Sequence, residues 1–162
     1  MTYLLDANVF ISAKNAYYGM DFAPAFWGWL AQAHTAGLVS TVQAVGSEIK
    51  GGADELAVWA KAQPDSFFRA PDSEAVDAMA EVSGWCAAEQ RFEPAARATF
   101  LSGADFYLVA QAKALGFVVV THERSEPASK RIVKIPDACI AAEVRYISPW
   151  AMLRNEGARF VL

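Results

Sequence analysis

The chain has 162 residues, 54% of them hydrophobic, so it can bury one substantial core and falls within the usual range for a single domain. Its net charge of −4 argues against a protein that coats nucleic acid through bulk electrostatics alone. No uncharged run approaches the length of a membrane span, nothing resembles a secretory signal, and the two cysteines, Cys86 and Cys139, lie outside any CxxC pattern. We therefore expect one cytoplasmic domain over residues 1–162, without a disulfide framework or a zinc finger.

The first half of the chain predicts short apolar strands that alternate with helices. A buried strand over residues 3–5 is stopped by Asp6. Asp21 and Pro24 signal the start of a helix over residues 25–36, which Gly37 closes, and a second strand follows over residues 38–42. Two short helices are predicted next, over residues 43–51 and 54–63, and a connecting loop over residues 64–71.

The second half continues the alternation. A longer helix over residues 73–90 has Ser73 as its expected N-cap, and a helix over residues 104–115 is ended by Gly116. The apolar run over residues 117–120 predicts a third buried strand, and residues 126–134 predict a loop. The pattern favours an α/β fold with a mostly parallel sheet, in which ligands gather at the carboxyl ends of the strands.

Four acidic residues are candidates for a site at that edge, although each has an ordinary alternative role. Asp6 leaves a buried strand, where it could equally cap the following turn. Glu48 lies on a predicted helix, where an exposed glutamate is the default. Asp105 lies at a helix start, where an acid favours the helix dipole, and Glu123 follows the third strand closely.

Together the four acids match a known pattern. The segments YLLDANVFI, SEI, GADFYLVAQA and VVVTHE resemble, in order and character, the acidic motifs of PIN-domain nucleases, which include the VapC-type toxins. Asp6 and Asn8 stand at the family's opening Asp-x-Asn, Glu48 at its helix glutamate and Asp105 at the aspartate that opens a late helix. Glu123 falls on the acidic position of the Thr-x-Asp motif, with glutamate in place of aspartate. The later KIPDAC run favours a PIN-like branch distinct from the well-studied toxins.

The resemblance implies a three-layer α/β/α fold and an endoribonuclease that hydrolyses RNA phosphodiester bonds. It implies that Asp6, Glu48, Asp105 and Glu123 are both the catalytic residues and the ligands of one or two Mg²⁺ (or Mn²⁺) ions, which prefer hard oxygen ligands. For toxin members it further implies a homodimer and a cognate antitoxin as partners, besides the RNA substrate.

Other polar residues support smaller predictions. Asn8, Thr121 and Ser125 could orient a ligand or a water behind the acids, although a hydrogen bond within a turn is the favoured role of Ser125. His122 is expected to point away from Glu123, because side chains alternate along a strand end. Four basic residues could meet RNA phosphates, with a solvated loop equally favoured: Arg124, Lys130, Arg131 and Lys134.

The large aromatic residues are expected to be core or partner surface more often than a platform for bases. They are Phe22, Phe26, Trp27, Trp29, Trp59, Trp85 and Trp150.

Three other classes of protein and one rival ligand fit part of the pattern. A haloacid-dehalogenase-like phosphatase would need an aspartate where Asn8 stands, and a receiver domain would need an acidic pair near the first strand. A non-catalytic PIN-like interaction module would not need an acid at all four positions. Asp137 rivals Glu123 as the fourth ligand, but it follows Pro136, where a turn or helix cap is the default.

Overall fold

Short apolar runs form the central sheet of this protein, and a computed structural model describes all residues, 1–162. The five strands are all parallel and lie in the order β3-β2-β1-β4-β5. Every residue of the three central strands is buried, as expected for a parallel sheet with helices on both faces. The bounds are β1 Tyr3–Leu5, β2 Val39–Val42, β3 Phe68–Arg69, β4 Val118–Val120 and β5 Tyr146–Ile147.

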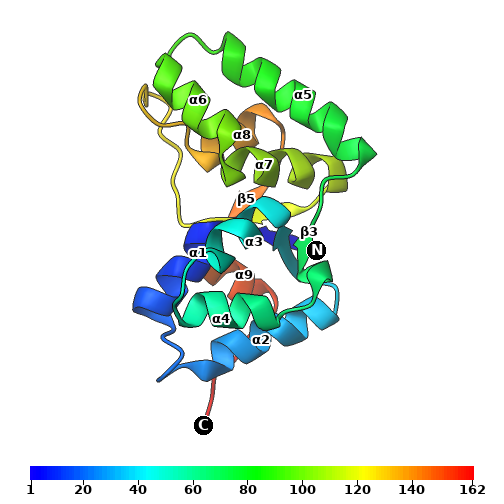
Figure 1. Cartoon of the computed structure of the whole chain (residues 1–162), viewed down its shortest axis with the longest axis vertical. Coiled ribbons are helices and arrows are strands. Elements are labelled where there is room, and N and C mark those ends of the chain that lie inside the picture. Colours follow the sequence, from blue (N-terminus) through cyan, green and yellow to red (C-terminus); the bar gives the residue numbers. More distant parts are fainter.

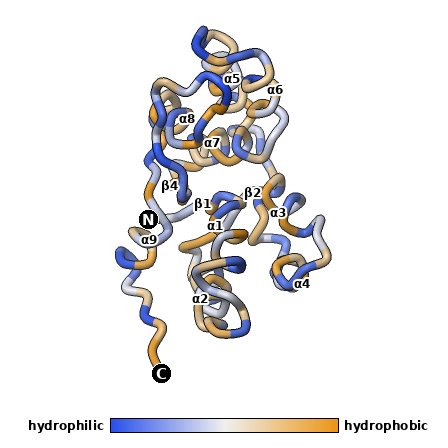
Figure 2. Tube along the Cα trace, turned by 90° about the vertical axis from the view of Figure 1, so that its left-hand side faces the viewer, coloured by the Kyte–Doolittle hydropathy of each residue, from blue (hydrophilic) through white to orange (hydrophobic).

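The helices form a layer on each side of the sheet. Figure 1 shows α5, α6, α7 and α8 on one side and α1, α2, α4 and α9 on the other, and Figure 2 shows the same division after a quarter turn. The bounds are α1 Ala7–Ser12, π-helical η1 Ala13–Tyr17, α2 Pro24–Thr35, α3 Gln43–Lys50, α4 Glu55–Ala62, 3-10 helical η2 Asp65–Phe67, α5 Ser73–Ala88, α6 Pro94–Ser102, α7 Ala104–Leu115, α8 Ile135–Ala141 and α9 Pro149–Asn155.

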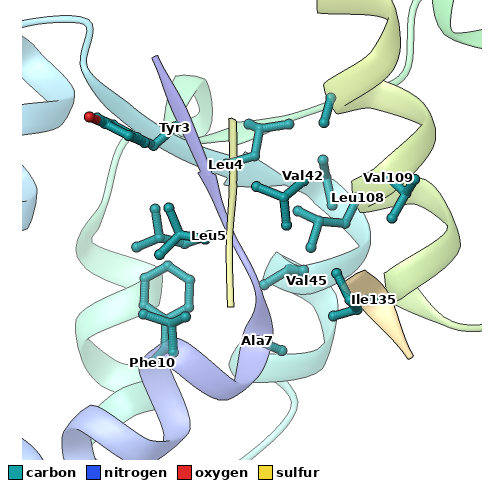
Figure 3. Packing of buried hydrophobic residues seen from close by; sticks show 14 of the residues in the cluster. Tyr3, Leu4, Leu5, Ala7, Phe10, Val42, Val45, Leu108, Val109 and Ile135 are labelled. Carbon is teal, nitrogen blue, oxygen red and sulfur yellow. The ribbon is translucent and has the colours of Figure 1, made fainter. Parts of the chain in front are cut away.

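Successive side chains of β1 enter the two halves of the core. Figure 3 shows Tyr3 and Leu5 on the side of Phe10, and Leu4 on the other side, towards Leu108 of α7. This alternation follows from the pleat of a strand, which sends successive side chains to opposite faces. Forty-one buried residues form one continuous apolar cluster around the sheet. The sheet is thereby held rigidly between the two helical layers.

The predicted α/β fold with a mostly parallel sheet is confirmed, in a three-layer α/β/α arrangement.

Gly116 closes α7 in the left-handed conformation, with φ of 67°, as its position after the helix predicts. The predicted N-cap Ser73 is wrong, because the Asp72 carboxylate accepts the N–H of Ala75 and Ser73 is already helical. The segment 64–71, expected to be a loop, contains η2 and the edge strand β3. None of the helices is both long enough and apolar enough to cross a bilayer.

A candidate acidic site at the carboxyl edge of the sheet

The pairing of β1 with β4 brings the first two acidic positions together. Leu5 is the register partner of Val120, and the Asp6 N–H donates to the Val120 carbonyl at 3.0 Å. The residues that follow the two strands, Asp6 and Thr121, are therefore neighbours. The Thr121 hydroxyl donates to Asp6 Oδ2 at 3.0 Å, within the buried interior.

The other two acids reach this edge on helices. α7 ends at Gly116, where the chain reverses into β4. The end of α7 therefore lies beside the start of β4, and the first turn of α7, with Asp105, lies at the carboxyl edge of the sheet. α3 begins where β2 ends and packs against α7, which places Glu48 beside Asp105. The charges of Glu48 and Glu123 both act on Asp105, and those of Asp105 and Glu123 both act on Asp6. The four predicted acids thus share one electrostatic environment.

Asp6 is the most buried acid of the site, with 1% of its surface exposed. Its carboxylate accepts the Asn8 N–H at 3.3 Å as the N-cap of α1, besides the Thr121 hydroxyl. Burial and the charge of Asp105 raise the pKa of Asp6, the hydrogen bonds from Asn8 and Thr121 oppose the rise, and the resulting pKa is about 7. Asp6 therefore lacks the positive charge that a buried carboxylate needs to stay ionised.

Asp105 is in a similar position. Burial, together with the charges of Glu123 and Glu48, raises its pKa to about 6. No Lys, Arg or His forms an ion pair with any of the four acids, since the ion pairs of the structure lie elsewhere: Lys14 with Asp54, Lys113 with Glu81, Arg131 with Glu93 and Lys134 with Glu126. The site concentrates negative charge without compensating it.

Glu123 is held from two sides. Its Oε2 accepts the N–H of Ile135, the first residue of α8, at 2.8 Å, and its own N–H donates to the Thr121 hydroxyl oxygen at 3.1 Å. Thr121 consequently bonds both Asp6 and Glu123. The Glu123 side chain, which is longer than the aspartate of the family motif, is anchored to α8. Its charge still acts on Asp6 and Asp105.

Asp137, the rival ligand, is occupied elsewhere. Its two oxygens accept the Ser125 hydroxyl at 2.5 Å and the Glu126 N–H at 3.0 Å, which ties the loop after β4 to α8. The Ser125 hydroxyl is used in that contact, and Asn8 bonds Asp6 through its backbone while its side chain is exposed. Of the three predicted supporting residues, Thr121 alone contacts the acids through its side chain.

The oxygen ligands of the four acids suit a hard divalent cation, but they do not enclose a complete coordination site. The ligands on offer are carboxylate oxygens, which Mg²⁺ prefers, and the uncompensated burial of Asp6 is the kind of cost that a bound cation removes. No group of three or more His, Cys, Asp or Glu side chains is arranged to hold an ion by itself. A Mg²⁺ ion held by these carboxylates would need waters and substrate phosphates to complete its coordination.

The predicted RNA-contacting residues separate into two groups. Arg131 and Lys134 lie within 3.8 Å and 3.6 Å of the acidic partners Glu93 and Glu126. Arg124 and Lys130 are exposed and form no ion pair. Arg124 also lines a cavity of about 670 Å³ together with Glu123.

His122 has no hydrogen bond to the acids, and its ring packs against Tyr17 and Trp150. Burial lowers its pKa. His122 and Glu123 nevertheless line the same cavity. Sequence reasoning did not single out Tyr17, since nothing in the local pattern connects it to residues near the end of the chain.

A second cavity, of about 750 Å³, lies beside β2 and β3. Its lining includes Ser40, Lys50 and Arg69 and none of the four acids. Arg69 bonds the Ser40 hydroxyl at 3.1 Å, and the Lys50 ammonium lies 3.9 Å from the Phe68 ring centroid. Because none of the four acids lines this cavity, we place the candidate site at the carboxyl edge.

A family model described as "Domain of unknown function (DUF4411)" matches residues 3–160 of this chain. The match includes all four acids. No curated protein and no solved structure matches the chain significantly.

Proposed function

The chain belongs to the DUF4411 family, whose description names no activity, and from its acidic site we propose that it is a metal-dependent endoribonuclease that hydrolyses RNA phosphodiester bonds. The observation that carries the proposal is the buried Asp6 carboxyl, with a pKa raised to about 7, beside three more acids and no cation. Such an arrangement costs stability unless a cation compensates it, and costs of this kind concentrate at functional sites.

Each acid has a defined position in the proposed mechanism. Asp6, Glu48, Asp105 and Glu123 are the residues that would hold Mg²⁺ or Mn²⁺. When bound, such an ion supplies Lewis-acid stabilisation of the charge that develops on the reacting phosphate. Thr121 fixes the Asp6 carboxylate, and the Ile135 N–H fixes that of Glu123, so the ligands are oriented before substrate arrives.

RNA is proposed as the substrate because the order of the acidic motifs resembles that of PIN-domain ribonucleases. The exposed Arg124 beside Glu123 supports a polyanionic substrate, since a cation without an acidic partner can neutralise a phosphate. The same resemblance makes a toxin role, a cognate antitoxin and a homodimer parts of the proposal. We place the activity in the cytoplasm, where free cysteines such as Cys86 and Cys139 persist.

A non-catalytic PIN-like interaction module is the second candidate. It is favoured by one observation, the lack of three acids arranged to hold an ion by themselves. Titration of the purified chain with Mn²⁺ in a calorimeter separates the two candidates. The ribonuclease requires saturable binding that Asp105→Asn weakens, and the interaction module requires none.

The test of the ribonuclease is a cleavage assay on labelled RNA with Mg²⁺. Asp6→Asn and Asp105→Asn keep the side-chain volume while removing a charge, so each should abolish cleavage by a folded protein. Asp77→Asn is the matched control, because Asp77 is an exposed aspartate of α5 without an ion pair. Wild-type cleavage rates in either site variant would exclude that residue as a ligand.

A further inference from the structure

Three aromatic rings meet at the surface beside the acidic site. The Tyr17 ring lies 5.4 Å from that of His122 and 5.4 Å from that of Trp150, and His122 and Trp150 lie 5.0 Å apart, measured between centroids. We refer to Tyr17, His122 and Trp150 as the aromatic cluster. Tyr17 is 47% exposed and Trp150 38% exposed, whereas Phe26 and Trp27 are 1% and 4% exposed. Of the large aromatic residues expected in the core or on a partner surface, Phe26 and Trp27 lie in the core and Trp150 lies at the surface.

The fold brings the aromatic cluster to the same edge as the acids. Tyr17 ends η1, which continues the helix capped by Asp6, and His122 follows β4. Trp150 lies in the first turn of α9, directly after β5. In η1 the Tyr18 N–H bonds the Ala13 carbonyl five residues back, the wide turn of a π-helix, which is frequent at functional sites.

The aromatic cluster and the acidic site share a cavity. The cavity of about 670 Å³ is lined by all three rings and by Thr121, Glu123 and Arg124. Its volume lies within the range of sites that hold small organic ligands. A ligand on the rings is therefore in reach of the fixed carboxylate of Glu123.

The three rings are tilted or edge to face relative to one another, with interplanar angles of 35° for Tyr17 and His122, 85° for Tyr17 and Trp150 and 62° for His122 and Trp150. Tyr18 and Phe26, by contrast, are stacked at 9° and 4.3 Å, so that each covers a face of the other. An exposed ring that is not covered by a stacked neighbour can accept a flat aromatic ligand on its face.

The polar lining of the cavity contains both an acidic residue, Glu123, and a basic residue, Arg124. The Ser125 hydroxyl is bonded to Asp137, and the Ser148 hydroxyl accepts the Ala151 N–H as the cap of α9. Arg124 is exposed and has no acidic partner. A ligand that satisfies both the rings and the guanidinium has a flat aromatic part and an anionic part, as a nucleotide does.

We infer that Tyr17 and Trp150 form a stacking platform for an unpaired base of RNA next to the bond that is cut, with Arg124 on the adjacent phosphate. This inference rests on the proposed ribonuclease function and specifies its substrate as single-stranded at that position. In a duplex the faces of a base are covered by its neighbours, whereas an unpaired base can stack on a protein ring. Stacking tolerates any base, so the platform selects single strands rather than a sequence.

The experiment measures binding of a fluorescently labelled RNA by anisotropy, as a single strand and as its duplex, with Mg²⁺ and the full chain. The Asp105→Asn background prevents cleavage during the measurement. Tyr17→Ala and Trp150→Ala should each weaken single-strand binding by roughly 5-fold to 150-fold and leave duplex binding unchanged. Tyr17→Phe and Trp150→Phe should bind like the background.

Phe22→Ala is the matched control, because Phe22 is 68% exposed and lies outside the cavity. It should not change binding, and circular dichroism should give the same spectrum for all variants. Equal binding of single strand and duplex, or alanine variants that bind like the control, would overturn the platform.

Cleavage assays on the same variants, with Asp105 restored, separate the two proposals. Loss of single-strand binding in the alanine variants, together with no cleavage by the wild-type chain, would reject the ribonuclease and keep the platform as a single-strand binding site. Cleavage at equal rates on single strands and duplexes would reject the platform and keep the ribonuclease.

Discussion

For the Asp6 carboxyl, burial in the fold and a role as a metal ligand favour opposite protonation states. Its position after β1 buries it almost completely, and burial disfavours the charged form. A metal ligand needs that charged form. The bonds from Thr121 and Asn8 favour the carboxylate but do not offset burial and the charge of Asp105, since the pKa remains at about 7. A divalent cation would complete the compensation.

The raised pKa of Asp6 predicts how the stability of the metal-free protein depends on pH. The pKa of an unfolded aspartate is about 3.9, and that of Asp6 in the folded chain is about 7. The folded state thus binds this proton more tightly, so its contribution to stability is complete below about pH 3.9 and is lost as the pH rises through 7. Asp105, with a pKa of about 6, adds a similar loss.

Urea denaturation in chelator at pH 5 and pH 8 measures this loss. The free energy of unfolding at pH 8, relative to pH 5, should be lower in the wild-type chain than in Asp6→Asn by on the order of a few kcal/mol. Asp6→Asn should also be the more stable protein at pH 8. An identical pH dependence in the two proteins would show that Asp6 is not destabilised by its charge.

The fourth ligand is tested by a pair of substitutions. Glu123→Gln keeps an oxygen for the Ile135 N–H, so it should weaken Mg²⁺ binding and cleavage together with little effect on folding. Asp137→Asn weakens the charge-assisted bonds from Ser125 and Glu126, so it should lower the free energy of unfolding by about 1–3 kcal/mol and leave metal affinity unchanged. Calorimetric titration and urea denaturation give the two quantities. The opposite pattern would move the fourth ligand to Asp137.

Part of the acidic site could be predicted from sequence, because Asp6 and Glu123 follow strand ends and Asp105 opens a helix, whereas Glu48 lies near the end of α3 and was indicated only by the resemblance. The connections between the acids could not be predicted. For Ser125 a hydrogen bond within a turn was favoured over a place behind the acids, but its hydroxyl bonds Asp137 on α8, a helix that the local pattern did not predict. The contact of Tyr17 with Trp150 depends on how η1 and α9 meet at one edge, which no local periodicity reports.

α4 and α7, which have their own termination signals, were predicted, whereas α6, α8 and α9 were not, although Pro94, Pro136 and Pro149 mark their first turns. α4 has the capping carboxylate of Asp54, and α7 has the left-handed Gly116 at its end. β3 and β5 each have two residues and depend on pairing with β2 and β4. Since a two-residue strand has no detectable alternation, both edges of the sheet were missed.

α7 connects the core to the acidic site, because it carries both Leu108 and Asp105. Leu108 is fully buried and, in Figure 3, lies on the side of β1 that faces α7, one turn from Asp105. Leu108→Ala should lower the free energy of unfolding by about 2–5 kcal/mol, because it leaves a cavity between α7 and the sheet.

Val76→Ala is the control for Leu108→Ala, since Val76 is 59% exposed on α5 and should cost about 0.5 kcal/mol or less. Urea denaturation compares the two variants. Similar costs for both would contradict the packing of α7 that brings Asp105 to the carboxyl edge.

At the scale of the whole molecule, two helical layers cover the faces of the sheet and leave its carboxyl edge to loops and helix starts (Figure 1). Acids that are distant in sequence meet there, with the aromatic cluster beside them. The net charge of −4 repels RNA at long range. Productive binding therefore depends on local features, namely a bound cation, Arg124 and the exposed rings.

Metal binding should stabilise the whole fold. An ion that binds the folded chain and not the unfolded one raises the melting temperature by mass action. Mg²⁺ should therefore raise the melting temperature of the wild-type chain above that in chelator, at matched ionic strength. Asp6→Asn should lose the rise and Asp77→Asn should keep it. A rise of equal size in all three proteins would indicate a cation effect unrelated to the acidic site.

The most direct measurement is cleavage of labelled RNA by the purified chain, first in chelator and then after excess Mg²⁺ is added to the same sample. The acidic site predicts no cleavage in chelator and its appearance on addition of Mg²⁺, because the four carboxylates have no cation of their own. Cleavage that proceeds at an unchanged rate in chelator would contradict the metal-dependent mechanism.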